Sequence, residues 1–241
     1  MTNPTAAMIV IGDEILSGRT RDSNMNHLAK ELTQHGVELC EARVVSDDRA
    51  AIVQAVRDLS GCYDHIFTSG GIGPTHDDIT ADSVAEAFGD HIDIRDDARK
   101  LLMDYFESRG VEATEGRMRM ARIPDSATLI DNPVSIAPGF TIRNVHVMAG
   151  VPAVFEAMVA SVLPGIKGGA PLLSQTLRID RPEGEVAGPL RKLAETYPDV
   201  SIGSYPFNDK GAFGTNIVIR GQDGASVDAA MIALCEEFPN P

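Results

Sequence analysis

Short apolar runs that alternate with segments of helical spacing constrain this chain more than any other feature of its sequence. Residues 7–11, 37–45 and 65–69 have the apolar character of strands, and each run is followed by a segment whose apolar residues recur every three or four positions. Strands that alternate with amphipathic helices form βαβ units, with parallel strands and helices on both faces. The sequence therefore predicts an α/β fold with a mostly parallel sheet.

Beyond this region the pattern changes. Residues 164–171 are rich in proline and glycine, as is typical of a linker. The residues that follow have a strand, helix, strand, strand, helix order. We therefore expect two domains, residues 1–166 and a small α+β domain over residues 171–241, and no catalytic grouping stands out in the second.

The charge of the chain restricts its partners. The 241 residues carry a formal net charge of −14, which argues against nucleic acid or an anionic membrane surface as a partner, because both require a basic footprint. Three widely spaced cysteines indicate neither a disulfide framework nor a zinc site, and no signal peptide or membrane span is visible. We expect a cytoplasmic protein that binds a small molecule.

A glycine loop follows the third apolar run. Gly70, Gly71 and Gly73 allow the backbone to turn and to bring N–H groups close to a ligand, and the helix expected after the loop adds its positive end. The loop is therefore a candidate anion site. Asp77 and Asp78 beside it would repel a phosphate unless a metal or a proton intervened. Alternatively, the glycines only form a tight turn, and Asp78 or Thr80 caps the helix.

Other loops are expected at the same edge of the sheet, because ligands of such sheets lie beyond the carboxyl ends of the strands. Gly12 could approach a ribose or phosphate and Glu14 a metal or hydroxyl, or both belong to a capping turn. Asn24 is an ordinary cap residue or a ligand-binding residue, and Asp47 caps a helix or faces the glycine loop.

Glu14, Asp47, Asp77 and Asp78 would together form a concentrated negative charge, which a hard divalent ion could compensate. Such an ion could activate water for attack on a bound pyrophosphate. His146 lies in an apolar run and is interpreted as a core residue rather than a ligand.

Four ordered motifs resemble a known family. The motifs are residues 12–18 with 22–24, residues 70–80, Asn132-Pro133 with residues 137–140, and Gly150-Val151-Pro152. With them the chain is similar to the N-terminal domain of the competence/damage-inducible CinA family, which belongs to the molybdopterin-binding superfamily of the MoaB and Mog proteins. Ala149 stands where many relatives have proline.

The resemblance implies a three-layer α/β fold and a site for a nucleotide or pterin phosphate. In Mog-type relatives, residues like Asp47 and Asp78 are implicated in metal-assisted adenylyl transfer to molybdopterin. CinA-type relatives are associated with hydrolysis of ADP-ribose to AMP and ribose 5-phosphate by a divalent metal, Mg²⁺, Mn²⁺ or Co²⁺. The Asp-Asp form at Asp77 is typical of the CinA branch.

We therefore expect a metal-dependent pyrophosphatase that acts on ADP-ribose or a similar nucleotide. Asp78, Asp77 and Asp47 are its expected catalytic residues, and Asp77 and Asp78 its metal ligands. The alternatives are adenylyl transfer to molybdopterin and a module that binds without turnover. Analogy with the superfamily implies a homo-oligomer, and the separate deamidase domain of full-length CinA is expected to be absent. The expected substrate-binding residues are Gly12, Glu14, Asn24, Gly70, Gly71, Gly73, Thr75, Asn132, Pro133, Gly139, Gly150 and Pro152.

Overall fold

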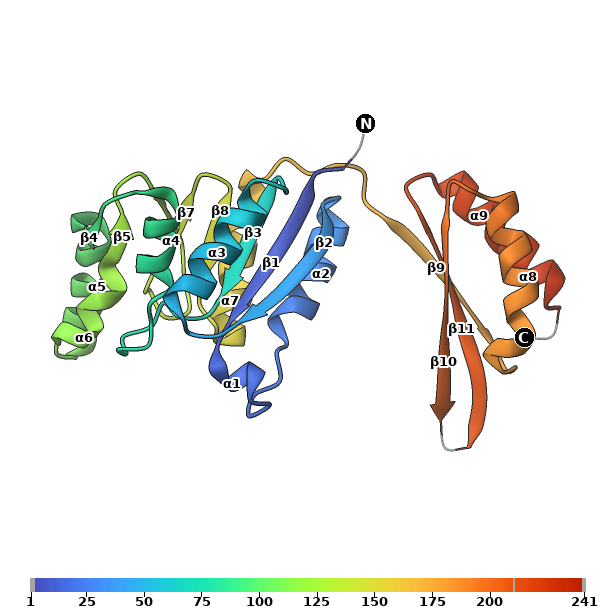
Figure 1. Ribbon diagram of the computed structural model, residues 1–241, viewed down its shortest axis with the longest axis horizontal. Coiled ribbons are helices and arrows are strands. Elements are labelled where there is room, and N and C mark those ends of the chain that lie inside the picture. Colours follow the sequence, from blue (N-terminus) through green and yellow to red (C-terminus); the bar gives the residue numbers. More distant parts are fainter. Residues whose placement is uncertain (1–2, 210, 240–241) are drawn as a thin grey trace. The chain divides into compact units, whose positions relative to one another are not determined.

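The chain forms two compact units, Met1–Gly169 and Ala170–Pro241. The computed structural model describes residues 3–209 and 211–239 (Figure 1). No helix within these residues is long and apolar enough to cross a membrane.

The first unit is built on a six-stranded sheet with the strand order β2-β1-β3-β8-β7-β6. The first four strands of this order are parallel, whereas β7 and β6 run antiparallel to their neighbours. The prediction of a mostly parallel α/β sheet is confirmed. The strands are β1 (Thr5–Ile11), β2 (Glu38–Val45), β3 (His65–Ser69), β6 (Thr128–Ile130), β7 (Gly139–Ile142) and β8 (Val145–Met148).

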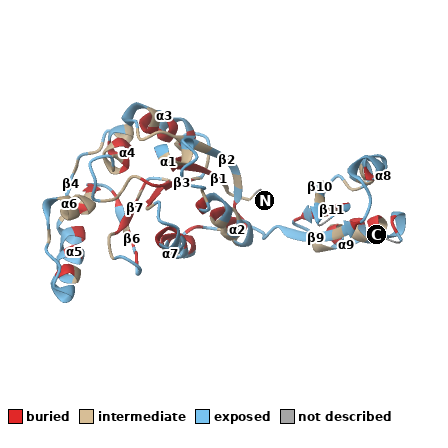
Figure 2. Cartoon of the chain, turned by 90° about the horizontal axis from the view of Figure 1, so that it is seen from below, coloured by how far each residue is buried: buried red, intermediate tan, exposed pale blue. Residues whose placement is uncertain are grey.

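Helices cover both faces of this sheet and complete three layers (Figure 2). Alternate residues of β1 point to opposite faces: Ile9 packs with α3 and α4, and Met8 packs with α2 and α7. Both residues are fully buried. The helices are α1 (Asp13–Leu16), α2 (Asn24–His35), α3 (Arg49–Ser60), α4 (Thr80–Phe88), α5 (Asp96–Arg109), α6 (Glu115–Met118) and α7 (Pro152–Val162), with single turns η1 (Arg119–Ala121) and η2 (Leu163–Gly165).

A separate two-stranded sheet sets two boundaries. Helix α5 begins at Asp96, after β4 (Ile92–Ile94), which pairs with β5 (Arg122–Pro124). The helical turns α6 and η1 end at Ala121, immediately before β5 begins. Periodicity cannot reveal three-residue strands, which are fixed by their pairing partners.

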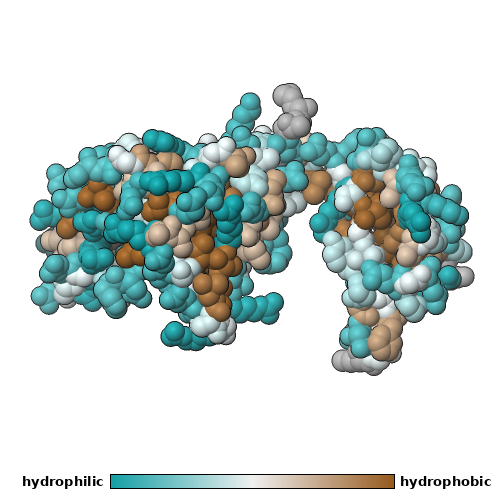
Figure 3. Space-filling view, in the orientation of Figure 1, coloured by the Kyte–Doolittle hydropathy of each residue, from teal (hydrophilic) through white to brown (hydrophobic). Residues whose placement is uncertain are grey.

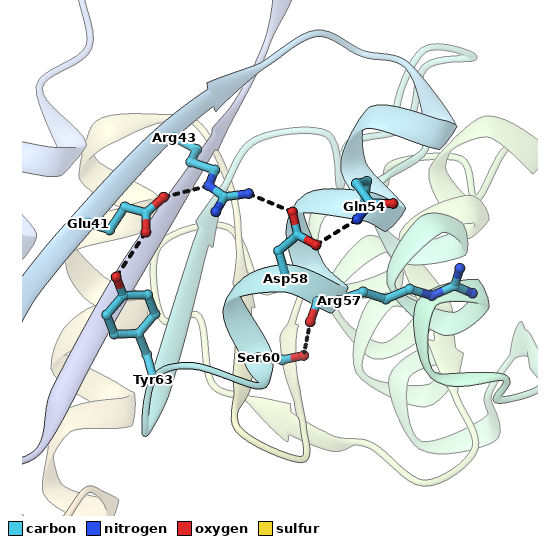
Figure 4. Close-up of polar contacts among 7 residues, drawn as sticks. All are labelled: Glu41, Arg43, Gln54, Arg57, Asp58, Ser60 and Tyr63. Atoms are coloured by element: carbon cyan, nitrogen blue, oxygen red, sulfur yellow. Dashed lines mark hydrogen bonds and ion pairs between the residues drawn. The ribbon is translucent and has the colours of Figure 1, made fainter.

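A charge network joins β2 to α3 and to the chain before β3 (Figure 4). Arg43 of β2 donates to Glu41 at 2.6 Å and to Asp58 of α3 at 3.0 Å, and the Tyr63 hydroxyl donates to Glu41 at 2.9 Å. These contacts hold the pKa of Glu41 below its usual range, chiefly through Arg43, and the same guanidinium lowers the pKa of Asp58. Every charge in this group has an opposite partner.

The second unit has a three-stranded antiparallel sheet, β10-β11-β9, with two helices packed on its apolar face. Ile217 and Ile219 of β11 are fully buried on that face. The turn predicted at residues 208–211 includes Lys210, which lies outside the described residues. The elements are β9 (Leu173–Ile179), α8 (Glu183–Thr196), β10 (Ser201–Asp209), β11 (Ala212–Gly221) and α9 (Gly224–Glu237).

The visible surface in Figure 3 is largely hydrophilic, with small separate hydrophobic patches. Leu16 at the end of α1, Val134 and Val151 are among the exposed large hydrophobic residues. Single exposed apolar residues of this kind are normal.

Candidate functional site

A hollow of about 540 Å³ lies at the carboxyl ends of β1, β2, β3 and β8. This edge is where ligands of open α/β sheets bind, and the volume falls in the usual range for small-molecule sites. The structure brings together eleven of the residues singled out from the sequence. They are Gly12, Glu14, Asp47, Gly70, Gly71, Gly73, Asp77, Asp78, Asn132, Gly150 and Pro152.

The glycine loop packs closely on the rest of the unit. Gly70 has a φ of 110°, and an added Cβ would lie 2.2 Å from the Ile11 carbonyl oxygen; Gly71 has a φ of 70°, and its Cβ would lie 2.1 Å from Thr80 Oγ1. A side chain at either position would collide with its neighbours and strain the backbone. Within the described residues, the N–H groups of Gly71, Ile72 and Gly73 donate no hydrogen bond. These three donors remain for a ligand.

Asp78 does not cap α4, whose N-terminal residue Ile79 makes no side-chain capping bond. Its carboxylate instead accepts from the Thr75 N–H at 2.8 Å and from the Thr75 hydroxyl at 2.5 Å. Asp78 is half-buried. Thr75 does not line the hollow. Its two hydrogen bonds to Asp78 hold that carboxylate in place and join two residues of the same loop.

Asp47 and Asp48 have separate roles. Asp48 caps α3 by accepting from the Ala51 N–H at 2.9 Å, whereas Asp47 accepts from the Asp13 N–H at 2.9 Å and faces the hollow. Burial raises the pKa of Asp47, and the carboxylates of Asp13, Glu14 and Asp77 raise it further, while the Asp13 N–H opposes them. The raised pKa shows that acidic groups from three loops act on one another here.

Among the carboxylates that line the hollow, Asp77 is the exposed one, with 62 % of its side chain exposed. Thr75 holds its pKa below the usual range, so Asp77 is ionised at neutral pH. Within residues 3–209 and 211–239, no group of three His, Cys, Asp or Glu side chains is placed to hold a metal ion. A cation at this edge would therefore need ligands beyond these side chains.

Asn24 lies beside the hollow and is almost fully buried. Its amide nitrogen donates to Ser69 Oγ at 2.7 Å and to the Gly150 carbonyl at 2.8 Å, which ties the start of α2 to the ends of β3 and β8. Asn24 lines a smaller adjoining hollow of about 60 Å³ rather than the main one. It positions the loops around the site.

Asn132 forms one wall of the hollow. Its amide nitrogen donates to Ser135 Oγ at 2.6 Å and to the Ala137 carbonyl at 2.8 Å, and its side-chain oxygen accepts from the Val134 and Ser135 N–H groups. Pro133 and Gly139 do not line the hollow. Gly139 is buried in β7, where a Cβ would lie 2.4 Å from the Val147 carbonyl oxygen, so its size serves packing.

Thr20, Met120 and Ser135 also line the hollow but were not predicted as site residues. Thr20 belongs to the loop after β1, which was expected at this edge, so its position in the loop was the only available signal. Met120 comes from η1, a segment that the sequence places far from the three loops.

His146 does not take part in this site. It is buried in β8, where its ring contacts Thr141 Oγ1 at 3.0 Å and the His65 ring nitrogen at 3.2 Å. Burial lowers the pKa of His146 to about 3, so the ring is neutral. The interpretation of His146 as a core residue is confirmed.

Comparison with known protein families divides the chain into the same two parts. A family described as "Probable molybdopterin binding domain" matches residues 7–168, and one described as "FAD synthase, middle domain" matches residues 171–241.

Similar proteins are found in animals and archaea. A "Probable FAD synthase" of Caenorhabditis elegans is 34 % identical over 96 % of this chain and 49 % of its own length, so the chain spans about half of that relative. A protein of Archaeoglobus fulgidus is 32 % identical over 83 % of this chain and 84 % of its own length. Among solved structures, the protein CinA of Thermoplasma acidophilum, described as of unknown function, is 34 % identical with a TM-score of 0.63, covering 68 % of this chain and 99 % of that one.

Proposed function

Because the chain belongs to the molybdopterin-binding domain family and is CinA-like, we propose that its hollow binds the diphosphate of a nucleotide and hydrolyses it. The substrate class is an adenosine diphosphate linked to a second group, as in ADP-ribose. FAD has the same adenosine diphosphate part, and the name of the Caenorhabditis relative adds it as a candidate substrate.

The observation that carries this proposal is the glycine loop. Among the residues that the structure describes, the N–H groups of Gly71, Ile72 and Gly73 have no acceptor, and these three residues line a hollow that also contains carboxylates from three loops. Backbone donors of this kind favour phosphate oxygens, and their partial charges are fixed before a ligand arrives. A hollow lined by carboxylates, with no histidine or cysteine among its lining residues, favours phosphoryl chemistry, which depends on positioning and charge compensation.

The acidic residues fit a divalent ion whose ligands come partly from the protein and partly from the substrate. Asp77 is exposed and ionised, and the pKa of Asp47 is raised, first by burial and then by the neighbouring carboxylates. Mg²⁺ is commonly held by one or two carboxylates together with substrate phosphates, so the missing third protein ligand agrees with this mode. Asp77 and Asp78 would hold the ion, with Mn²⁺ or Co²⁺ as further candidates. Such an ion neutralises phosphate charge and makes bound water a better nucleophile.

The chain's own residues would position the reacting groups. The glycine loop orients the diphosphate, and Asp47 Oδ2 is fixed by the Asp13 N–H, which leaves Oδ1 for a proton. The raised pKa of Asp47 makes it a better base than an ordinary aspartate. Water forms the new P–O bond, its proton passes to Asp47 Oδ1, and the bridging P–O bond breaks. ADP-ribose then yields AMP and ribose 5-phosphate.

Adenylyl transfer is the second candidate. It is favoured by the name "Probable FAD synthase" and by the family description. The transfer uses the same phosphoanhydride chemistry, but the attacking oxygen belongs to FMN or molybdopterin phosphate instead of water, and ATP releases pyrophosphate. A module that binds without turnover is the remaining alternative.

Product analysis separates these functions. We expect purified protein with Mg²⁺, Mn²⁺ or Co²⁺ to release AMP from ADP-ribose or FAD. Adenylyl transfer would instead give FAD from ATP and FMN, or adenylated pterin from ATP and molybdopterin. Calorimetric binding of nucleotide without any product, in protein whose fold is verified by circular dichroism, would identify a binding module and exclude the hydrolase.

A further inference from the structure

The main hollow has no basic side chain, although the ligand proposed for it is an anion. Its lining includes Glu14, Asp47, Asp77 and Asp78, but neither lysine nor arginine. Backbone N–H groups carry only partial charges, so a diphosphate at this site would still experience strong repulsion. A positive group near the glycine loop would reduce this repulsion even without a metal ion.

One arginine, Arg119, lies close to the glycine loop but outside the main hollow. Arg119 belongs to η1 and lines a small hollow of about 20 Å³ together with Gly71, Gly73 and Asp78. Its Nε is buried and has no hydrogen-bond partner. Within the described part of the chain, the Arg119 guanidinium also forms no ion pair. An unpartnered buried donor is uncommon, because it loses its contact with water without gaining an acceptor.

Arg122, in the same small hollow, shows the usual arrangement. Its guanidinium donates to Asp82 at 2.5 Å, and this contact raises the pKa of Arg122. Arg122 therefore joins β5 to α4, and its charge is already compensated. Arg119 is the arginine of this hollow whose charge remains available.

We propose that Arg119 is a phosphate-binding residue of the glycine-loop site, and this inference rests on the proposed function. The small hollow and the main hollow share Gly71, Ile72, Gly73, Asp78 and Met120 as lining residues. Two of these five residues are glycines, so part of the wall between Arg119 and a bound phosphate is backbone without a side chain. A guanidinium offers several donors to phosphate oxygens and retains its charge at every physiological pH.

A structural role for Arg119 is the competing explanation. Asp78 lines the same small hollow, so a rotated Arg119 could pair with it and stabilise the loop. In that case the charge would contribute to folding and would have no effect on ligands. The two roles differ in what removal of the charge changes: ligand affinity in one case, thermal stability in the other.

The test is calorimetric titration with ADP-ribose, in buffer with a chelator, of the wild-type protein and two variants. Arg119→Met retains the apolar stem but removes the charge, and Arg119→Lys restores a charge with fewer donors. We expect Arg119→Met to weaken binding about tenfold, since a hydrogen bond to a charged group is lost. Arg119→Lys should recover part of this loss, and the melting temperature should remain unchanged.

Two controls make the result specific. Arg99 is exposed on α5, and Arg99→Met makes the same change of net charge away from the site, so ADP-ribose affinity should not change. Adenosine lacks phosphate, so its affinity should be equal for the wild-type protein and Arg119→Met.

Equal ADP-ribose affinity of the wild-type protein and Arg119→Met would overturn the role of Arg119 and leave the proposed function intact. The role would also be overturned by a lower melting temperature with unchanged affinity, which would assign Arg119 to folding. If the wild-type protein binds no ADP-ribose, FAD or ATP with or without metal, both the proposed function and this inference are wrong.

Discussion

Strand β2 carries carboxylates in two opposite electrostatic situations. Near its middle, Glu41 lies against Arg43, which also contacts Asp58, and the pKa values of both acids are lowered (Figure 4). Just beyond its end, Asp47 is partly buried among other acids, and its pKa is raised, first by burial and then by these acids. The carboxylates are therefore stabilised by partners in one region and destabilised by burial and by neighbouring acids in the other, a few residues apart.

This difference separates residues that support the fold from residues that are arranged for chemistry. The paired charges of Glu41, Arg43 and Asp58 are more favourable in the folded protein than in the unfolded chain. Crowded carboxylates at the edge of the sheet are less favourable, and groups of this kind concentrate at functional sites. The comparison predicts that substitutions in the two regions will change different properties.

The largest expected effect is on activity. Asp47→Asn retains an acceptor for the Asp13 N–H but removes the proposed base, so we expect kcat/KM for AMP release to fall about 100-fold. Glu38→Gln, which changes an exposed carboxylate at the other end of β2, is the matched control and should retain full activity. Full activity of Asp47→Asn would show that the Asp47 carboxylate is not needed for AMP release.

A smaller effect is expected on stability from the paired region. Arg43→Met removes the shared partner of Glu41 and Asp58, so the melting temperature should fall by a few degrees at pH 7 without loss of kcat/KM. Because both acids have lowered pKa values, their stabilising effect is present above their ordinary values of 4.5 and 3.8 and is lost as the pH falls through the lowered values. Differential scanning fluorimetry should show the two proteins converging below about pH 4. A difference that persists in acid would indicate packing rather than charge.

The smallest expected effect has the opposite sign. Asp47 has a raised pKa, so its favourable contribution is present below the ordinary value of 3.8 and is lost as the pH rises through the raised value. Asp47→Asn should therefore melt slightly above the wild-type protein at pH 7, and the difference should disappear near pH 4. Reduced stability at pH 7 would show that the Asp47 carboxylate contributes more to the fold than its neighbours cost.

The sequence predicts most of the first unit because its signals are local. Apolar runs mark β1 and β3, and Gly36 ends α2 in the left-handed conformation that glycine adopts easily. The order of strands is not local. Nothing in the residues themselves indicates that β8 lies beside β3, or that β6 and β7 run antiparallel at the edge.

The same difference between local and non-local signals applies to the candidate site. The loops at Gly12, Asp47 and Gly70 were placed at one edge from the rule for parallel strands, and the structure brings them together. The bond from Thr75 to Asp78 depends on the detailed path of the loop, which spacing does not show. Arg119 was not predicted as a site residue, because only tertiary contacts place its segment close to the glycine loop.

The closeness of Gly70 and Gly150 has a consequence for folding kinetics. A Cβ on Gly150 would lie 3.2 Å from Gly70 Cα, so the turns that contain these two glycines are in close contact. Much of the unit separates them along the chain. Contacts between such distant segments form slowly, since a long loop must close first. A partly folded chain in which β1, β2 and β3 are paired but β8 is not would have an ordered sheet without the contact between the Gly70 and Gly150 turns. Recovery of ligand binding during refolding should therefore lag behind recovery of secondary structure.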